Sequence, residues 1–164
     1  MEPIFENKHQ RDVEIYRDVS AFCFFGQPII KILLLVSSLL AIIFATFTDK
    51  RLLGVIVLLF VVALCFGGYR RLLKIGIARE KELSSEPILY TVRFFDDKIE
   101  LSNTLGNSVN YEYSTVNKVV CAKNSILLVT KAKAIITLKR GAWTNGNDAD
   151  FVSFLRNKGF KVNF

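Results

Sequence analysis

Apolar side chains concentrate in two long runs, residues 29–47 and 52–69, which are separated only by residues 48–51. A helix rises about 1.5 Å per residue and the hydrocarbon core of a bilayer is about 30 Å thick, so roughly 20 apolar residues cross once. Neither run carries an ionised side chain in its middle. The pattern therefore predicts a two-helix transmembrane hairpin over residues 28–74, preceded by an N-terminal juxtamembrane segment, residues 1–27.

Lysine and arginine residues flank the two runs unequally. Eight lie near the outer ends of the two runs, and two lie in the connecting loop: Arg11, Arg17, Lys31, Arg70, Arg71, Lys74, Arg79 and Lys81 against Lys50 and Arg51. Basic residues near span ends are retained in the cytoplasm. We therefore expect a multi-pass protein of the inner (plasma) membrane with both termini cytoplasmic.

Small residues recur in both predicted spans and suggest how the helices pack. Ser37, Ala41 and Ala45 follow one another at four-residue spacing, and the second span contains Gly54 and Ala63. Small side chains let membrane helices approach closely, so we expect Ala45 near Gly54 and Ser37 near Ala63. A homo-oligomer through the same faces is one alternative, and the ordinary composition of membrane spans is another.

The segment before the first run combines apolar and charged residues over 12–25, which is typical of one face of a helix. Such a helix would lie along the inner membrane surface or dock on the soluble part of the chain. It is expected to end at the Gly26-Gln27-Pro28 sequence. Whether residues 3–5 add a strand stays open.

Beyond a linker, residues 75–87, the hydrophobic pattern changes to short alternating segments bounded by turn residues. Strands of an antiparallel meander are predicted over 88–95, 98–102, 109–113, 116–122, 125–130 and 134–138. A helix follows, with Asn147 as its N-cap, an apolar face of Phe151, Phe154 and Leu155, and Gly159 as its stop. The expected fold is a membrane α-helical hairpin plus an α+β domain, residues 88–164, in which a small antiparallel sheet is capped by the C-terminal helix.

Charge and cysteine content argue against nucleic-acid binding and against a metal site. The net charge of +7 is spread evenly, since residues 1–83 carry 11 Lys and Arg against 8 acids and residues 84–164 carry 11 against 7. An even excess favours a surface near anionic lipid over a nucleic-acid interface. Three cysteines without a CxxC spacing, and a single histidine, His9, that is expected to be exposed, predict no disulfide framework, no metal site and no cofactor.

No catalytic constellation emerges from the sequence, so we expect a protein that is not an enzyme. The acidic pairs Asp96-Asp97 and Asp148/Asp150 fit turn and helix-cap positions. A candidate ligand face for an anionic lipid headgroup or an acidic peptide comprises Lys131, Lys133, Lys139, Arg140 and Trp143. Against this, neighbouring strand residues point to opposite faces, exposed lysines are the ordinary covering of a basic domain, and Trp143 fits packing at the helix junction.

Three stretches carry a resemblance: 90–100 (YTVRFFDDKIE), the strand over 111–118, and 138–143 (LKRGAW) before a Phe-rich helix. Together with two adjacent spans and a basic exit, these resemble the YcxB-like bacterial membrane proteins. The family often has Pro-Lys-Arg and an aromatic residue at the strand-to-helix junction, whereas here Thr137-Leu138 precedes Lys139-Arg140. The ligand role of these two basic residues therefore does not follow from the family.

The resemblance implies a PH-like domain held at the cytoplasmic face of the membrane, and it provides no catalytic residues. Combined with the charge pattern, it predicts an interaction module that binds a protein partner or anionic lipid. Some bacterial members resemble self-protection proteins encoded beside membrane-active bacteriocins. Self-immunity is therefore the alternative function.

Overall fold

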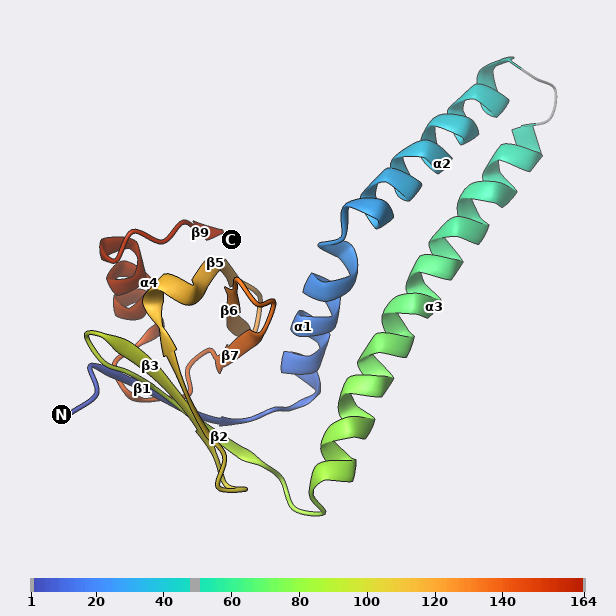
Figure 1. Cartoon of the computed structure of the whole chain (residues 1–164). Coiled ribbons are helices and arrows are strands. Elements are labelled where there is room, and N and C mark those ends of the chain that lie inside the picture. The colour runs from blue at the N-terminus through green and yellow to red at the C-terminus, as the bar shows by residue number, and fades with distance from the viewer. Residues whose placement is uncertain (1, 48–50, 164) are drawn as a thin grey trace. The chain divides into compact units, whose positions relative to one another are not determined.

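The computed structural model describes residues 2–47 and 51–163, which form an α+β structure (Figure 1). Its helices are α1 (Val13–Phe25), α2 (Pro28–Phe47), α3 (Arg51–Leu83) and α4 (Asp148–Asn157). Its strands are β1 (Phe5–Gln10), β2 (Leu89–Phe94), β3 (Lys98–Asn103), β4 (Ser108–Glu112), β5 (Val116–Cys121), β6 (Ser125–Thr130), β7 (Ile135–Lys139), β8 (Trp143–Asn145) and β9 (Val162–Asn163). A short 3₁₀ helix, η1 (Tyr113–Thr115), joins β4 to β5.

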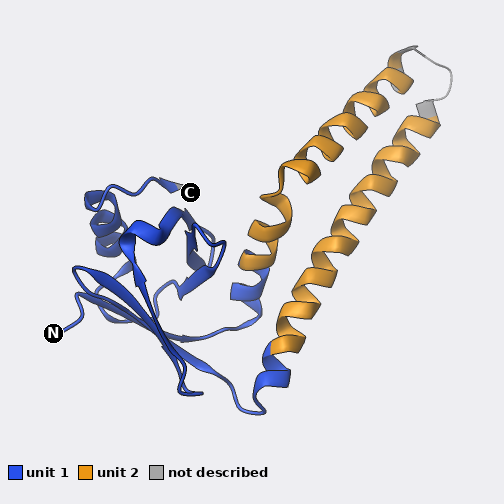
Figure 2. Ribbon diagram, in the orientation of Figure 1, with its two compact units in different colours: residues 1–18, 80–164 blue, residues 19–79 orange. Residues whose placement is uncertain are grey.

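The chain divides into two compact units (Figure 2). Unit 1 combines Met1–Asp18 with Glu80–Phe164, and unit 2 is Val19–Arg79. This division differs from the expected domains, because the N-terminal residues belong with the C-terminal part and α3 continues through the predicted linker to Leu83. The helical segment is therefore an insertion within the β-rich unit.

Unit 1 contains two sheets, with strand orders β4-β3-β2-β1-β8 and β7-β6-β5-β9. The six predicted strands correspond to β2 through β7, and their neighbouring pairs within each sheet are antiparallel. A further strand, β1, begins at Phe5, the last residue of the segment left open at the N-terminus, and pairs antiparallel with both β2 and β8. Among the described strands, β9 is the one that pairs in parallel, with β5.

The core of unit 1 lies between the sheets and α4. Val92 and Phe94 alternate with half-exposed residues along β2, as a strand with one buried face requires. The helix contributes Phe151 and Leu155, both fully buried, whereas Phe154 is only partly buried. The predicted cap forms, because the Asn147 side chain accepts a hydrogen bond from the amide of Asp150 at 2.9 Å.

The chain reverses after α4 as the sequence predicts. Gly159 adopts a φ of +88°, a left-handed conformation that glycine takes without steric strain. The amides of Gly159 and Phe160 donate to the carbonyls of Arg156 and Leu155. These bonds satisfy carbonyl groups at the end of the helix and direct the chain toward β9.

Unit 2 contains α2 and α3. One helix, over Leu52–Leu83, is long and apolar enough to cross a membrane. Val13–Phe25 and Pro28–Phe44 meet that criterion only as a pair, and they are bent by 68° at the break between them. Over residues 54–68 of α3 the less exposed positions are Gly54, Val57, Leu58, Val61, Cys65 and Gly68, which recur at helical spacing.

The small residues of the predicted helix packing lie in different surroundings. A side chain at Gly54 would meet the Ala41 carbonyl oxygen at 3.0 Å, so these two backbones approach closely. Ser37 is buried and its hydroxyl donates to the Leu34 carbonyl at 3.0 Å. Ala63 is exposed, because it lies on the opposite side of α3 from Gly54 and Cys65. The side chain of Ala45 and residues 48–50 lie outside the described residues.

Candidate functional site

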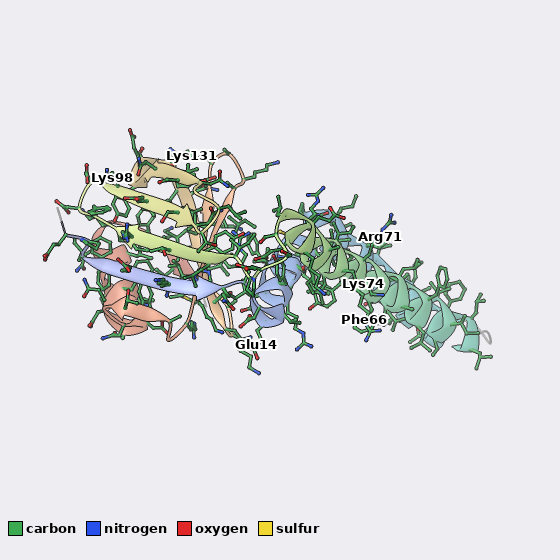
Figure 3. All side chains as sticks on the ribbon, turned by 90° about the horizontal axis from the view of Figure 1, so that it is seen from below. Glu14, Phe66, Arg71, Lys74, Lys98 and Lys131 are labelled. Carbon is green, nitrogen blue, oxygen red and sulfur yellow. The ribbon has the colours of Figure 1, made fainter. Side chains whose placement is uncertain are left out.

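The four basic residues of the predicted ligand face lie at the two ends of β7. Lys131 and Lys133 are exposed on the turn between β6 and β7, where Figure 3 labels Lys131. Lys139 and Arg140 lie at the other end, after a strand of five residues, and are half-buried. At about 3.3 Å per residue the two end residues of β7 are about 13 Å apart, so the four basic residues do not form one site.

Lys139 is neutralised by a partner that the sequence did not indicate. Its ammonium nitrogen lies 2.6 Å from Asp12 Oδ2, and this contact raises the pKa of Lys139. Burial would raise the pKa of Asp12, but hydrogen bonds from Lys139 and from the Ile15 amide lower it overall. Asp12 therefore both caps α1 and pairs with β7, and Lys139 is not free to bind an anion.

Trp143 packs the junction between the sheet and α4. Its ring lies 4.7 Å from that of Phe151 and 6.1 Å from that of Phe5, centroid to centroid. The indole nitrogen donates to Asp148 Oδ1 at the first turn of α4. This is the packing role that the sequence left as an alternative to ligand binding.

Arg140 lines a shallow hollow beside α4, of about 400 Å³. Arg156, from the last turn of α4, lines the same hollow, and Asp148 is occupied by Trp143 and the Gly141 amide. The Arg140 Nε atom is buried and has no hydrogen-bond partner among the described residues. Two guanidinium groups beside one hollow can bind an anionic group through charge-assisted hydrogen bonds. We refer to this surface as the arginine hollow.

A second hollow, of about 550 Å³, lies beside the edge strand β4. Its lining combines two carboxylates, two phenol rings and one ammonium group: Asp97, Lys98, Asn110, Tyr111, Glu112, Tyr113 and Ser114. Burial, and after it the carboxylates of Asp96 and Asp97, raises the pKa of Tyr113. The Tyr113 hydroxyl donates to the Phe95 carbonyl at 2.6 Å, which fixes the ring. We refer to this surface as the acidic hollow.

His9 is buried rather than exposed, which corrects the expectation from the sequence. It is only 3% exposed because β1 lies in the middle of its sheet. Asn7 donates through Nδ2 to the Lys139 carbonyl at 2.8 Å and accepts through Oδ1 from the Lys139 amide at 3.2 Å. Asn7 therefore links β1 to β7 across the two sheets.

The fixed orientation of Asn7 also determines the state of His9. His9 Nδ1 lies 2.8 Å from Asn7 Oδ1, an acceptor, so Nδ1 carries the proton and Nε2 does not. Burial, together with the charges of Arg11 and Lys139, lowers the pKa of His9 to about 4. A neutral, buried imidazole of this kind stabilises the junction of the sheets and is out of reach of an exposed substrate.

The sequence did not indicate Arg156, the edge of β4 or Asn7 as parts of these sites. The sequence did indicate the Asp96-Asp97 turn and a strand that contains Tyr111. The pairing of β3 with β4 is what brings Asp97 and Tyr111 to the same hollow. Among residues 2–47 and 51–163, no group of three or more His, Cys, Asp or Glu side chains could hold a metal ion.

Comparisons with known proteins give no further assignment. No family model, curated protein or solved structure matches the chain. The resemblance to the YcxB-like proteins is therefore carried by the sequence patterns alone. Function has to be argued from the geometry of the two units.

Proposed function

We propose that this chain is a non-enzymatic interaction module anchored in the inner membrane, with a PH-like β-domain that binds a partner at the cytoplasmic face. The observation that carries the proposal is the exposure of many large apolar side chains along both α2 and α3. Soluble proteins rarely expose apolar patches larger than a few hundred Å². The most exposed examples are Ile29, Ile32, Leu35, Leu52, Leu59 and Phe60.

The pairing of β1 with β2 supports two crossings rather than one. Gln10 pairs with Leu89, so the chain leaves the sheet and returns to it at neighbouring positions, about 5 Å apart. A single crossing would put these two strands on opposite sides of the bilayer, where they could not pair. A helix of 20 residues, α2, followed by the apolar part of α3 provides the two spans.

Charge supports the proposed orientation. Basic residues follow the apolar part of α3, and Figure 3 labels Arg71 and Lys74 after Phe66 on this helix. The excess of lysine and arginine on the flanking side favours that side as cytoplasmic. Unit 1 would then lie in the cytoplasm, and its two mostly antiparallel sheets with a C-terminal helix agree with a PH-like domain.

The arginine hollow is the surface of unit 1 best suited to an anionic lipid headgroup or an acidic side chain. Anchoring would keep it at the membrane surface, where anionic lipid is concentrated. A photo-crosslinking amino acid in place of the exposed Ser153, which lines this hollow, tests the role in living cells. We expect one adduct of defined mass, a phospholipid or a protein, that disappears with Arg140→Ala and Arg156→Ala. The same crosslinker at exposed Lys123 is the control, and identical adducts from both positions would contradict the proposal.

Self-protection against a membrane-active peptide is the second candidate function. The acidic hollow favours it, because such peptides are commonly cationic and two carboxylates line this hollow. Only residues 48–51 connect the two apolar runs, so protection would act within the bilayer or from the cytoplasmic side. Expression in a sensitive strain should raise the inhibitory concentration of the peptide. No rise, with membrane expression confirmed, would remove stand-alone immunity.

A further inference from the structure

The edge of the five-stranded sheet is open at β4. This strand pairs with β3 on one side and has no strand on its other side among the described residues. Ser108, Val109 and Asn110 are exposed, and Val109 is 46% exposed. In an antiparallel edge strand about half of the backbone N–H and C=O groups point away from the sheet. β4 therefore presents unpaired backbone groups to an incoming strand.

Several of the usual protections of an edge strand are missing from β4, although this strand is short and ends in the charged Glu112. Its five residues contain no proline and no lysine, and its pairing with β3 runs from Lys98↔Glu112 to Ser102↔Ser108 without a bulge. Natural proteins use these devices to prevent unwanted strand addition. Their absence at a regular edge is compatible with a strand that accepts a partner.

The acidic hollow lies directly beside this edge and determines which side chain would fit. Asp97 and Glu112 contribute carboxylates, and Tyr111 and Tyr113 contribute aromatic rings. The one cation of the lining, Lys98, lies over the Phe95 ring at 5.5 Å from its centroid. The lining therefore carries a net charge of −1 (two carboxylates, one ammonium) in a chain whose net charge is +7.

The neighbouring carboxylate Asp96 is held by Lys158, whose ammonium nitrogen lies 2.6 Å away. Asp97 forms no ion pair with any described residue, and the Glu112 carboxylate accepts a hydrogen bond from one described side chain, the hydroxyl of Ser114, at 3.0 Å. A lysine or arginine side chain in the hollow would thus meet two available carboxylates and aromatic rings. The hollow complements a basic group.

We propose that β4 and the acidic hollow together bind an extended polypeptide segment that carries a basic side chain. The segment adds a strand antiparallel or parallel to β4, and its basic side chain enters the hollow beside the strand. A lipid headgroup would use the hollow but would leave the backbone groups of β4 unpaired. The inference gives the partner class of the interaction module described above and in that sense rests on the proposed function.

The test uses the full chain in neutral detergent micelles and a fluorescent ten-residue peptide of alternating threonine and lysine. Anisotropy measures the affinity, and hydrogen exchange measures the protection of amides 108–112. A threonine–glutamate peptide tests charge, and a threonine–lysine peptide N-methylated at alternate residues tests backbone pairing. The variant carrying Asp97→Asn and Glu112→Gln tests the hollow, with Glu86→Gln, an exposed carboxylate outside it, as the matched control.

We expect the lysine peptide to bind and to protect β4, and the glutamate and N-methylated peptides to bind at least tenfold more weakly. The double variant should lose at least tenfold in affinity with an unchanged unfolding midpoint, and Glu86→Gln should bind like the unmodified chain. Absent binding, equal binding of the three peptides, or β4 amides already protected by a second copy of the chain would each overturn the proposal. A failure of membrane anchoring would not alter this measurement, because it is made in detergent.

Discussion

Units 1 and 2 use similar apolar residues in opposite ways. In unit 1, Phe94 and Phe151 are fully buried between the sheets and α4. In unit 2, Ile29 is 67% exposed and Leu52 is 77% exposed. Unit 1 therefore provides its own apolar environment, whereas unit 2 leaves many of its apolar side chains exposed, as the proposed membrane anchor requires. The number of apolar residues in a segment therefore does not show whether the segment belongs to a protein core. In water apolar side chains are buried inside the protein, whereas in a bilayer they can face the lipid.

The largest expected effect comes from removing β1. This strand lies between β2 and β8, so its loss would open the sheet in the middle. We expect residues 84–164 alone to remain unfolded. Residues 1–18 joined to 84–164 by a flexible linker should fold without the helices of unit 2. Unfolding in urea, followed by the fluorescence of Trp143, measures both, and a cooperative transition of 84–164 alone would contradict the account.

The core of unit 1 predicts a difference between two phenylalanines of α4. Phe151 is fully buried, with its ring centroid 4.6 Å from that of Phe94, whereas Phe154 is partly buried. Phe151→Ala should lower the free energy of unfolding by about 3–5 kcal/mol. Phe154→Ala should cost less, although the sequence alone marked it as equally important. Equal losses in urea denaturation would show that the helix packs differently.

The stability of unit 1 should fall in mild acid because of His9. The folded state holds its pKa at about 4 against an ordinary 6.5, so the unfolded chain binds more protons between these pH values. Stability is thus fully present above pH 6.5 and should drop by about 2 kcal/mol between pH 7 and pH 5.

Protonation of Glu6 and Asp12 does not account for the loss of stability between pH 7 and pH 5. Their pKa values are lowered from 4.5 and 3.8, so their protonation reduces stability only at lower pH. His9→Gln should remove most of the change between pH 7 and pH 5, measured by urea denaturation at both values. The same pH dependence in this variant would rule out His9 as its source.

The smallest effect compares two glycines of α3 within unit 2. A side chain at Gly54 would lie 2.9 Å from Phe44 Cβ, whereas one at Gly67 would meet nothing within 4 Å. Alanine favours a helix over glycine by about 1 kcal/mol. Gly67→Ala should therefore be neutral or stabilising, and Gly54→Ala should push α2 and α3 apart. Spin-label distances between the two helices in micelles should increase for Gly54→Ala alone, and equal distances would remove this packing contact.

Local patterns in the sequence predicted most individual elements of unit 1. Six strands, the cap at Asn147 and the reversal at Gly159 follow from alternation and turn residues that act over a few positions. β1 was not predictable in this way, because its buried face consists of Phe5, Asn7 and His9, two of which are polar. Its partners lie far away in the sequence, so only the folded sheet reveals it.

The candidate sites were less predictable than the fold. Lys131, Lys133, Lys139 and Arg140 are close in sequence, but β7 separates them into two pairs. Asp12 and Lys139 are 127 positions apart, and their ion pair depends on the return of the N-terminus to the β-domain. The acidic hollow likewise combines residues from two turns and an edge strand. Sites built from distant segments leave no local signal in the sequence.

In the proposed topology the chain crosses the membrane twice, so that β2 lies on the same side as β1 and can pair with it. Single cysteines at positions 2, 50 and 145, in a chain whose three native cysteines are replaced by alanine, test it directly in sealed cells. The account predicts that an impermeant thiol reagent labels position 50 in intact cells and labels positions 2 and 145 only after lysis. Labelling of position 2 or position 145 without the other in intact cells would mean a single crossing and would contradict the pairing of β1 with β2.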